Sequence, residues 1–402
     1  MKTATSAPAT LPSEDAAVLQ LVLEMMAIPG KSGLESAIQK YIVDKLLAAG
    51  LPQSAITRDD THKKSIIGGE VGNLIVKLPG TLKGPRRLLM AHVDTVPLCV
   101  GCKPERRGDV VRSADPTTAL GADDRAGAAI LLSAALKILR DKLPHPPLTF
   151  FWPVQEEIGL WGVRNAKTSL LGNPKLCFNW DGGDPRTVCI GATGAQELLI
   201  EIQGIASHAG VHPEAGVSAL GVASLAISEL QQNGWHGLII KGKKQGTSNL
   251  GVVNGGDATN VVMPAVKIRG EVRSHDPKFR AKLVKVFETA FKNAVKTVKN
   301  NTGKRGKLNF EAQLKYESFR IDPKEPCVKE AYRAIQSLGL EPIPHISNGG
   351  LDANWLSDFG FPTVTLGCGQ HQVHTVEEYL DIKEFLDGCR IGLFLATAGA
   401  AT

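Results

Sequence analysis

The chain has 402 residues, 43% of them hydrophobic, which is enough for two or three domains with substantial cores. A net charge of +6 is small for this length, and the mostly scattered basic residues argue against nucleic-acid binding. The longest apolar block, Ala126–Leu136, is too short to span a bilayer, and no apolar core of a secretory signal precedes Asp15. We therefore expect a cytoplasmic protein with no membrane or nucleic-acid partner.

The first part of the chain alternates helices with short apolar strands. Residues 1–12, rich in Ala, Thr and Pro, are expected to be frayed. Helices are predicted at 14–27, from a capping box at Ser32 and Glu35 to about Gly50, and at 125–140. The predicted strands are 73–78, 87–93, 148–154 and 176–180. This alternation predicts an α/β layered sheet.

Near residue 195 the pattern changes. The order strand, helix, strand, strand, helix, strand follows, which is the ferredoxin-like split unit, at 196–205, 217–230, 248–253, 266–273, 277–298 and 307–316. After about Pro323 the α/β character returns, with a helix to 338, a strand at 362–366 and a helix at 381–398. We therefore predict one α/β domain, formed by residues 1–194 and 319–402, that is interrupted by an inserted α+β domain at 195–318.

Seven cysteines at irregular spacing do not indicate a disulfide framework. Cys99 and Cys102 form a CxxC motif, but no second CxxC accompanies it. Incidental reduced thiols are therefore favoured over a zinc ribbon or a redox pair.

Two adjacent glutamates, Glu156 and Glu157, follow the apolar segment 148–154. Successive side chains of an extended segment point in opposite directions, so the two carboxylates are expected to serve different purposes. Two ionised carboxylates need positive charge nearby, and the motif itself contains no Lys or Arg. A metal ion is the natural counter-charge, bound by one carboxylate while the other faces substrate or water.

Two motifs place further metal-binding side chains near the ends of predicted elements. His92 and Asp94 share one face of a strand, so Asp94 could orient His92 as a metal ligand; the alternative is a strand-end histidine capped by its neighbour. Asp123 and Asp124 precede a helix, where one aspartate suffices as an N-cap and leaves the other free to bind metal.

Two more motifs are ambiguous when taken singly. Asp181 follows the strand at 176–180 but could belong to a simple Asp-Gly turn, and His374 could be a ligand or a loop histidine. Together, however, the motifs follow strands of one α/β domain or lead into its helices, and ligands of such sheets bind outside the carboxyl ends of the strands. We therefore expect convergence of His92, Asp123, Glu157, Asp181 and His374. Such a set suits two Zn²⁺-like ions about 3.5–4 Å apart with one bridging carboxylate, and it leaves Glu156 as general base.

These segments resemble the co-catalytic zinc metallopeptidases that include peptidase T, carboxypeptidase G, succinyl-diaminopimelate desuccinylase and the aminoacylases. The matching segments run in the family's order over nearly the whole chain: AHVDTVP, LGADDRAG, PVQEEIGLWG, NWDGG, ASHAGVHPEAGVSAL, DATNVVMPA and VHTVEEYL. NGGLDAN at 348–354 and HTVEEYL at 374–380 make the chain most similar to the peptidase T-like branch. The resemblance implies a mixed-sheet α/β/α zinc-exopeptidase catalytic domain interrupted by a lid and dimerisation domain.

The resemblance also implies a metal-binding role for each matching ligand. His92 and Asp181 would bind one zinc ion, and Glu157 and His374 the other. Asp123 would bridge the two ions, with a cis peptide bond to Asp124.

Further residues would act on the substrate. Asp94 would orient His92, and Glu156 would deprotonate the metal-bridging water and pass the proton to the leaving amine. From the inserted domain, His208 would reach a partner subunit's active site and stabilise the oxyanion. Asn260 and Arg273 would bind substrate oxygens; their alternatives are an ordinary turn residue and a surface charge.

The sequence thus predicts a cytoplasmic, homodimeric exopeptidase with two Zn²⁺ per subunit, or Co²⁺ or Mn²⁺ in their place, that acts on short peptides as an aminotripeptidase. The alternative enzyme is an N-acyl amino-acid deacylase or carboxypeptidase with the same metal site. A metal-dependent binding protein without catalysis is disfavoured because Asp94, Glu156 and His208 are all present. The sequence assigns no role to His212 or His371 and does not decide which end of a peptide is cleaved.

Overall fold

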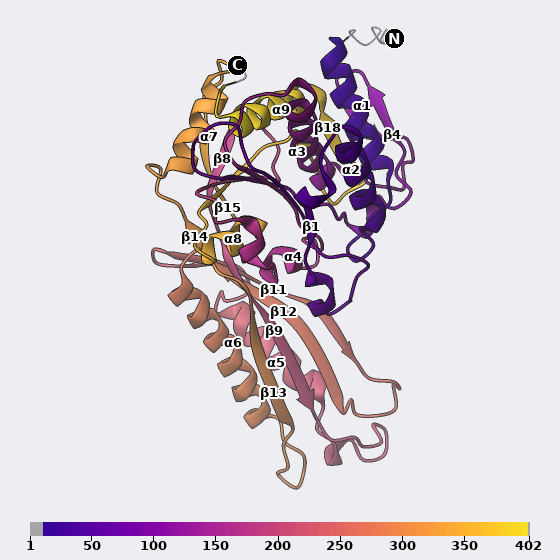
Figure 1. Cartoon of the computed structure of the whole chain (residues 1–402). Coiled ribbons are helices and arrows are strands. Elements are labelled where there is room, and N and C mark those ends of the chain that lie inside the picture. The colour runs from indigo at the N-terminus through magenta and orange to yellow at the C-terminus, as the bar shows by residue number, and fades with distance from the viewer. Residues whose placement is uncertain (1–10, 401–402) are drawn as a thin grey trace, which may run out of the picture. The chain divides into compact units, whose positions relative to one another are not determined.

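The computed structural model describes residues 11–400, which form two compact units (Figure 1). The first unit contains the chain up to Gly191, Arg320–Ser347 and the chain from Leu351 onward; the second contains Ala192–Phe319 and Asn348–Gly350. Most of the predicted frayed tail, residues 1–12, lies outside the described residues. None of the helices in the described part is long and apolar enough to cross a membrane.

A nine-stranded sheet with the order β1-β2-β6-β3-β7-β16-β8-β14, in which β15 also pairs with β8, forms the centre of the first unit. Its strands are β1 (Ile56–Arg58), β2 (Leu74–Leu78), β3 (Arg87–Met90), β6 (Leu148–Trp152), β7 (Leu176–Trp180), β8 (Thr187–Ala192), β14 (Phe319–Arg320), β15 (Ile343–Ser347) and β16 (Thr363–Leu366). The central strands β6, β3, β7 and β16 run parallel, whereas β2 and β8 are antiparallel to their neighbours β6 and β16. The mixed α/β class predicted from the sequence is therefore confirmed, as are the predicted strands that correspond to β2, β3, β6, β7 and β16.

Helices cover both faces of this sheet. The unit contains α1 (Ser13–Ala27), α2 (Ser36–Ala48), α3 (Ala122–Asp141), α4 (Trp161–Arg164), α7 (Pro326–Gln336), α8 (Asp352–Asp358) and α9 (Ile382–Thr397). Trp152 donates its indole N–H to the carbonyl of Ala128 in α3, at 3.3 Å. Its neighbour Phe151 joins a core cluster with Val163 of α4 and Leu356 of α8. Because successive strand residues point to opposite faces, α3 lies on one side of the sheet and α4 and α8 lie on the other.

A second, four-stranded sheet in the first unit has the order β17-β18-β5-β4. It contains β4 (Pro104–Arg107), β5 (Val110–Ser113), β17 (Gln370–His371) and β18 (Tyr379–Asp381). Gly108, at φ +66°, lies between β4 and β5, in a conformation that favours glycine. The sequence gives little indication of this sheet, because its strands are short and partly charged.

The second unit is built on a five-stranded antiparallel sheet with the order β10-β11-β12-β9-β13. Its elements are β9 (Gly194–Gln203), α5 (Ala219–Gln232), β10 (Gly237–Lys241), β11 (Lys244–Gly255), β12 (Ala265–Ser274), α6 (Pro277–Thr297) and β13 (Lys307–Tyr316). The two helices and one face of the sheet share a core that includes Leu198, Ile268 and Phe287. The predicted split unit is present with one unpredicted edge strand, β10.

The capping box predicted at Ser32 and Glu35 is wrong. Glu35 precedes α2, but its side chain makes no capping hydrogen bond, and the N–H of Ser36 donates instead to Glu70 Oε2 at 3.2 Å. Ser32 instead donates its hydroxyl to Asp94 Oδ2 at 2.6 Å, and Glu35 Oε1 accepts from the N–H of Gly33 at 2.7 Å. Both side chains therefore belong to a buried polar network of the first unit.

Candidate metal centre

The carboxyl ends of the parallel strands position the candidate ligands. His92 comes two residues after β3, Asp181 directly after β7, and Glu157 in the turn that follows β6. His374 lies in the segment between β17 and β18, which follows β16. Since these strands are neighbours and run parallel, their ends meet at one edge of the sheet, as the sequence predicted.

Two groups of potential metal ligands result, each with all its ligand atoms within 4.8 Å of one another. His92, Asp123 and Asp181 form one group, and Asp123, Glu157 and His374 form the other. Asp123 belongs to both, and each of its oxygens faces a different histidine. Oδ1 lies 3.2 Å from His92 Nε2, and Oδ2 lies 3.1 Å from His374 Nε2. The structure thus brings the five predicted residues together; their binding of metal stays a prediction.

The two aspartates at the start of α3 have separate contacts. The peptide bond between Asp123 and Asp124 is cis, as the resemblance implied, and both residues have non-helical backbone angles. Asp124 Oδ1 accepts from the N–H of Gly127 at 3.0 Å and so caps the helix. Asp123 is the residue that faces the two histidines.

The glutamate pair does not lie on a strand, which corrects the sequence interpretation. β6 ends at Trp152, and Pro153 follows, which has no N–H to continue the ladder. Gln155 has a left-handed backbone (φ +56°), and the carbonyl of Glu156 accepts from the N–H of Leu160 at 2.7 Å. A turn, rather than strand alternation, therefore separates the directions of the two carboxylates.

Asp94 holds that turn. Its Oδ1 accepts from the N–H of Glu156 at 2.9 Å, and its Oδ2 accepts from the N–H of Glu157 at 3.2 Å. The contact with His92 is looser, because His92 Nδ1 lies 3.5 Å from Asp94 Oδ1 and 3.1 Å from the carbonyl oxygen of Asp94. The expected orientation of His92 by the Asp94 carboxylate stays a prediction.

The groups around Asp123 carry an excess of buried acid. Burial raises the pKa of Glu156 well above its usual value, and burial with the charge of Asp123 does the same to the pKa of Asp181. Hydrogen bonds to Asp123 and Glu157 raise the pKa of His374 to about 10. Glu157 Oε1 is buried and has no hydrogen-bond partner among residues 11–400. A cation bound by these N and O atoms would satisfy such a set, so the residues fit a zinc-like metal.

Four further residues, for which no role was predicted, border the site. Glu378 accepts from the N–H groups of Gly121 and Asp123, and Gln370 Nε2 donates to Asp181 Oδ1 at 3.2 Å. Arg125 is buried, and burial lowers its pKa to about 10, although the charge of Asp94 acts in the opposite direction.

The fourth, Asp352, is buried with no hydrogen-bond partner for either carboxylate oxygen in the described chain. Burial raises the pKa of Asp352 to about 7. Asp352 lies in the NGGLDAN motif, which was the one feature of the sequence that could have drawn attention to it.

His371 and His212, which the sequence left open, lie in different units. His371 Nε2 is 2.6 Å from Glu384 Oε2, and its ring stacks on Tyr379 with 4.9 Å between centroids. These contacts hold the segment before His374. His212, in the second unit, is exposed and lies 3.4 Å from Glu214.

Three predicted substrate-binding or catalytic residues belong to the second unit. His208 is exposed, and its Nδ1 accepts from the N–H of Gly210 at 3.2 Å. The N–H of Ala209 donates to the carbonyl of Asn260 at 2.8 Å, so the His208 and Asn260 segments are adjacent. Arg273 lies on β12 and pairs with Glu271, at 2.7 Å between Nε and Oε1. Their functional roles stay predictions.

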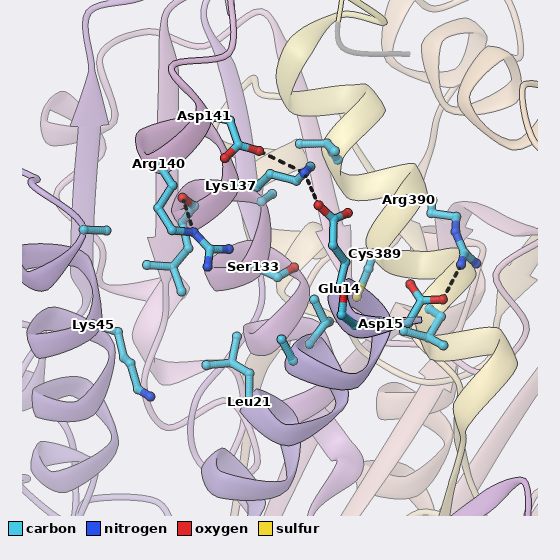
Figure 2. Close-up of a pocket in the computed structure, with 18 of the residues that line it drawn as sticks. Glu14, Asp15, Leu21, Lys45, Ser133, Lys137, Arg140, Asp141, Cys389 and Arg390 are labelled. Atoms are coloured by element: carbon cyan, nitrogen blue, oxygen red, sulfur yellow. Dashed lines mark hydrogen bonds and ion pairs between the residues drawn. The ribbon is translucent and has the colours of Figure 1, made fainter. Parts of the chain in front are cut away.

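A cavity of about 670 Å³ lies among α1, α2, α3 and α9 (Figure 2). None of the candidate ligands lines it. Lys137 pairs with Glu14 at 3.0 Å and with Asp141 at 2.9 Å, and Arg390 pairs with Asp15 at 2.9 Å. These ion pairs largely neutralise the charged side chains that line the cavity, and we assign the cavity no function.

Comparison with known proteins decides the family. The sequence model of peptidase family M20/M25/M40 matches residues 88–397. The chain belongs to this family. Membership makes it a peptide-bond hydrolase. The enzyme class predicted from the sequence is therefore confirmed, as is the resemblance to this family of metallopeptidases.

Among relatives of this M20 peptidase, the uncharacterized protein YqjE of Bacillus subtilis is 30% identical over 369 residues, which cover 92% of this chain and 94% of that protein. Peptidase T of a Geobacillus species is 25% identical over 296 residues, covering 71% and 67% of the two chains. The crystal structure of a tripeptidase from Staphylococcus aureus has a TM-score of 0.84 and 31% identity, with 96% and 99% coverage. Aminopeptidase PepT of Bacillus cereus has a TM-score of 0.81 and 29% identity, with the same coverage. These similarities support the predicted peptidase T-like branch.

Proposed function

We propose that this M20 peptidase is a two-metal aminopeptidase that removes the first residue of short peptides, in the manner of an aminotripeptidase. The observation that carries the proposal is the position of Asp123, which contributes to both candidate metal groups. A carboxylate shared between two ligand groups is the arrangement of two-metal hydrolytic sites. The similarity to a tripeptidase and to an aminopeptidase over almost the whole chain supports the choice of substrate.

His92, Asp123 and Asp181 would hold one ion, and Asp123, Glu157 and His374 the other. When bound, such ions polarise a carbonyl and bring the pKa of water from about 15.7 toward about 7. Imidazole and carboxylate ligands suit zinc, and they also accept Co²⁺ or Mn²⁺.

Glu156 is the proposed general base. It follows the turn residue Gln155 and precedes the ligand Glu157, and its backbone is held by Asp94 at 2.9 Å. Its buried carboxyl can take a proton from the attacking water and give that proton to the leaving amine, which general acid–base catalysis requires of one group.

The second unit is proposed to serve as a lid and dimerisation domain. His208 is suited to donate to the developing oxyanion, because its Nδ1 accepts from Gly210 and its Nε2 can therefore carry the proton. Asn260 and Arg273 would bind the oxygens of the substrate. A homodimer in the cytoplasm, in which His208 acts on the partner's site, completes the proposal.

Digestion of a peptide library by the metal-loaded protein, read by mass spectrometry, tests this function. The library contains di-, tri- and tetrapeptides, with N-acetylated copies of each sequence as matched controls. The proposal expects loss of the first residue, fastest from tripeptides, and no cleavage of acetylated copies. Loss of the last residue would indicate a carboxypeptidase, and release of acetate would indicate a deacylase; either result would overturn the aminopeptidase assignment.

A further inference from the structure

The segment before α3 that carries Asp123 needs an external partner for its backbone. Gly121 has a left-handed conformation (φ +78°), and Asp123 and Asp124 are not helical. The first N–H groups of a helix have no partner within the helix, and buried N–H groups are costly to leave unpaired. In this segment, therefore, the orientation of Asp123 depends on whichever group accepts from these amides.

Glu378 is that group. Its Oε2 accepts from the N–H of Gly121 at 2.8 Å, and its Oε1 accepts from the N–H of Asp123 at 3.0 Å. The residue is 1% exposed, so solvent does not compete for these bonds. One carboxylate thus holds two amides on either side of Ala122 and limits the rotation of the Asp123 backbone.

The same glutamate is anchored close to His374. The N–H of Glu378 donates to the carbonyl of Thr375 at 3.1 Å, which makes a tight turn directly after His374. The neighbouring carbonyl of Glu377 accepts from Arg112 of β5 at 2.7 Å. Glu378 lies 255 positions after Asp123 in the chain. It therefore connects the segments of two proposed ligands, Asp123 and His374, that are distant in sequence.

We propose that Glu378 is a positioning residue that fixes Asp123 relative to His374 and thereby sets the metal affinity of the group formed by Asp123, Glu157 and His374. The inference rests on the proposed two-metal function. Hydrogen-bond partners behind metal ligands typically change metal affinity by about 10–100-fold when they are removed. The other group also contains Asp123, but its two remaining members have supports of their own. Gln370 contacts Asp181, and the carbonyl oxygen of Asp94 contacts His92, so the effect on that group is smaller.

The test is a calorimetric titration of metal-free Glu378→Gln with Zn²⁺, together with activity measured as a function of Zn²⁺ concentration. Glutamine keeps the size but replaces one acceptor by a donor, which faces an N–H group. We expect one binding event weakened about 10–100-fold and the other weakened less, with kcat recovering at saturating Zn²⁺. Glu377→Gln is the matched control, because it changes the same charge on an exposed neighbour, and it should bind both ions as the wild type does.

Unchanged affinities at both sites in Glu378→Gln would overturn the inference, as would equal weakening of both. If this variant does not fold, Glu378→Asp keeps a buried carboxylate that is too short to span both amides, and the same selective loss is expected. A wild-type protein that binds fewer than two ions would instead contradict the proposed function, so the two failures are distinguishable.

Discussion

Asp123 is the residue on which both candidate metal groups depend. Its two oxygens lie within 3.2 Å of two different histidines, whereas His374 belongs to one group only. We predict that Asp123→Ala loses both ions and that His374→Ala keeps one, as measured by metal analysis of the purified variants. His371→Ala, in the same segment but paired with Glu384, should keep both. Retention of two ions by Asp123→Ala would contradict the shared-ligand assignment.

Glu35 is a buried acid whose proton affects stability. Burial and the charge of Asp94 raise its pKa from 4.5 to about 8. As pH rises through this interval, the unfolded chain releases the proton while the folded chain retains it. The folded state therefore loses stability, by at most about 1.4 kcal/mol per pH unit.

Glu35→Gln has no such proton and keeps the acceptor for Gly33. We predict that the free energy of unfolding of this variant, relative to wild type, increases from pH 5 to pH 8. Urea unfolding of the metal-free proteins at several pH values measures the difference. A difference that stays constant across this range would show that the Glu35 proton is not held in the folded state.

The candidate ligands were predictable from the sequence because each has a local signal: an acidic or His motif that follows a strand or opens a helix. Asp352 and Glu378 lie in the NGGLDAN and HTVEEYL motifs, but neither motif indicates which of its polar residues contacts the site. Their importance arises from contacts across the chain, such as the bonds from Glu378 to Gly121 and Asp123. Such contacts exist only once the sheet has brought the segments together.

At the level of elements, the spacing of apolar residues along the chain predicted the buried strands and the long helices. β7 is fully buried and was predicted at its observed bounds. β10 was missed because Leu238 and Ile240 are exposed on an edge strand, and their neighbours include glycine and lysine. The turn after β6 was read as a strand because the apolar run does not show that Pro153 ends the ladder and that Gln155 takes a left-handed conformation.

The start of α6 offers a test of local structure in the second unit. Asp276 Oδ1 accepts from the N–H of Lys278 at 2.9 Å and of Phe279 at 3.1 Å, which is an N-cap. We predict that Asp276→Ala lowers the free energy of unfolding by about 1 kcal/mol, and that Asp276→Asn lowers it by less because asparagine also caps. Chemical denaturation measures both. Equal losses in the two variants would show that the ion pair with Lys244, rather than the cap, stabilises this end.

At the level of the whole molecule, the sequence predicted an α/β fold interrupted by an α+β segment, and each unit has its own sheet and core. Order along the chain suffices for that prediction, because a change from parallel-sheet alternation to a split unit is a local pattern. The four-stranded sheet β17-β18-β5-β4 combines residues from near 110 and near 375, and no local pattern predicts such a pairing.

The central claim is that Glu156 moves the proton in a site whose metals are held by other residues. The turnover of Glu156→Ala, on protein shown by metal analysis to carry the wild-type complement of ions, tests it most directly. Glu156 belongs to neither of the two groups of metal ligands, so its replacement should not change the metal content. We predict a fall in kcat of about 100-fold or more, the usual contribution of a general base. Wild-type kcat with both ions bound would contradict the account.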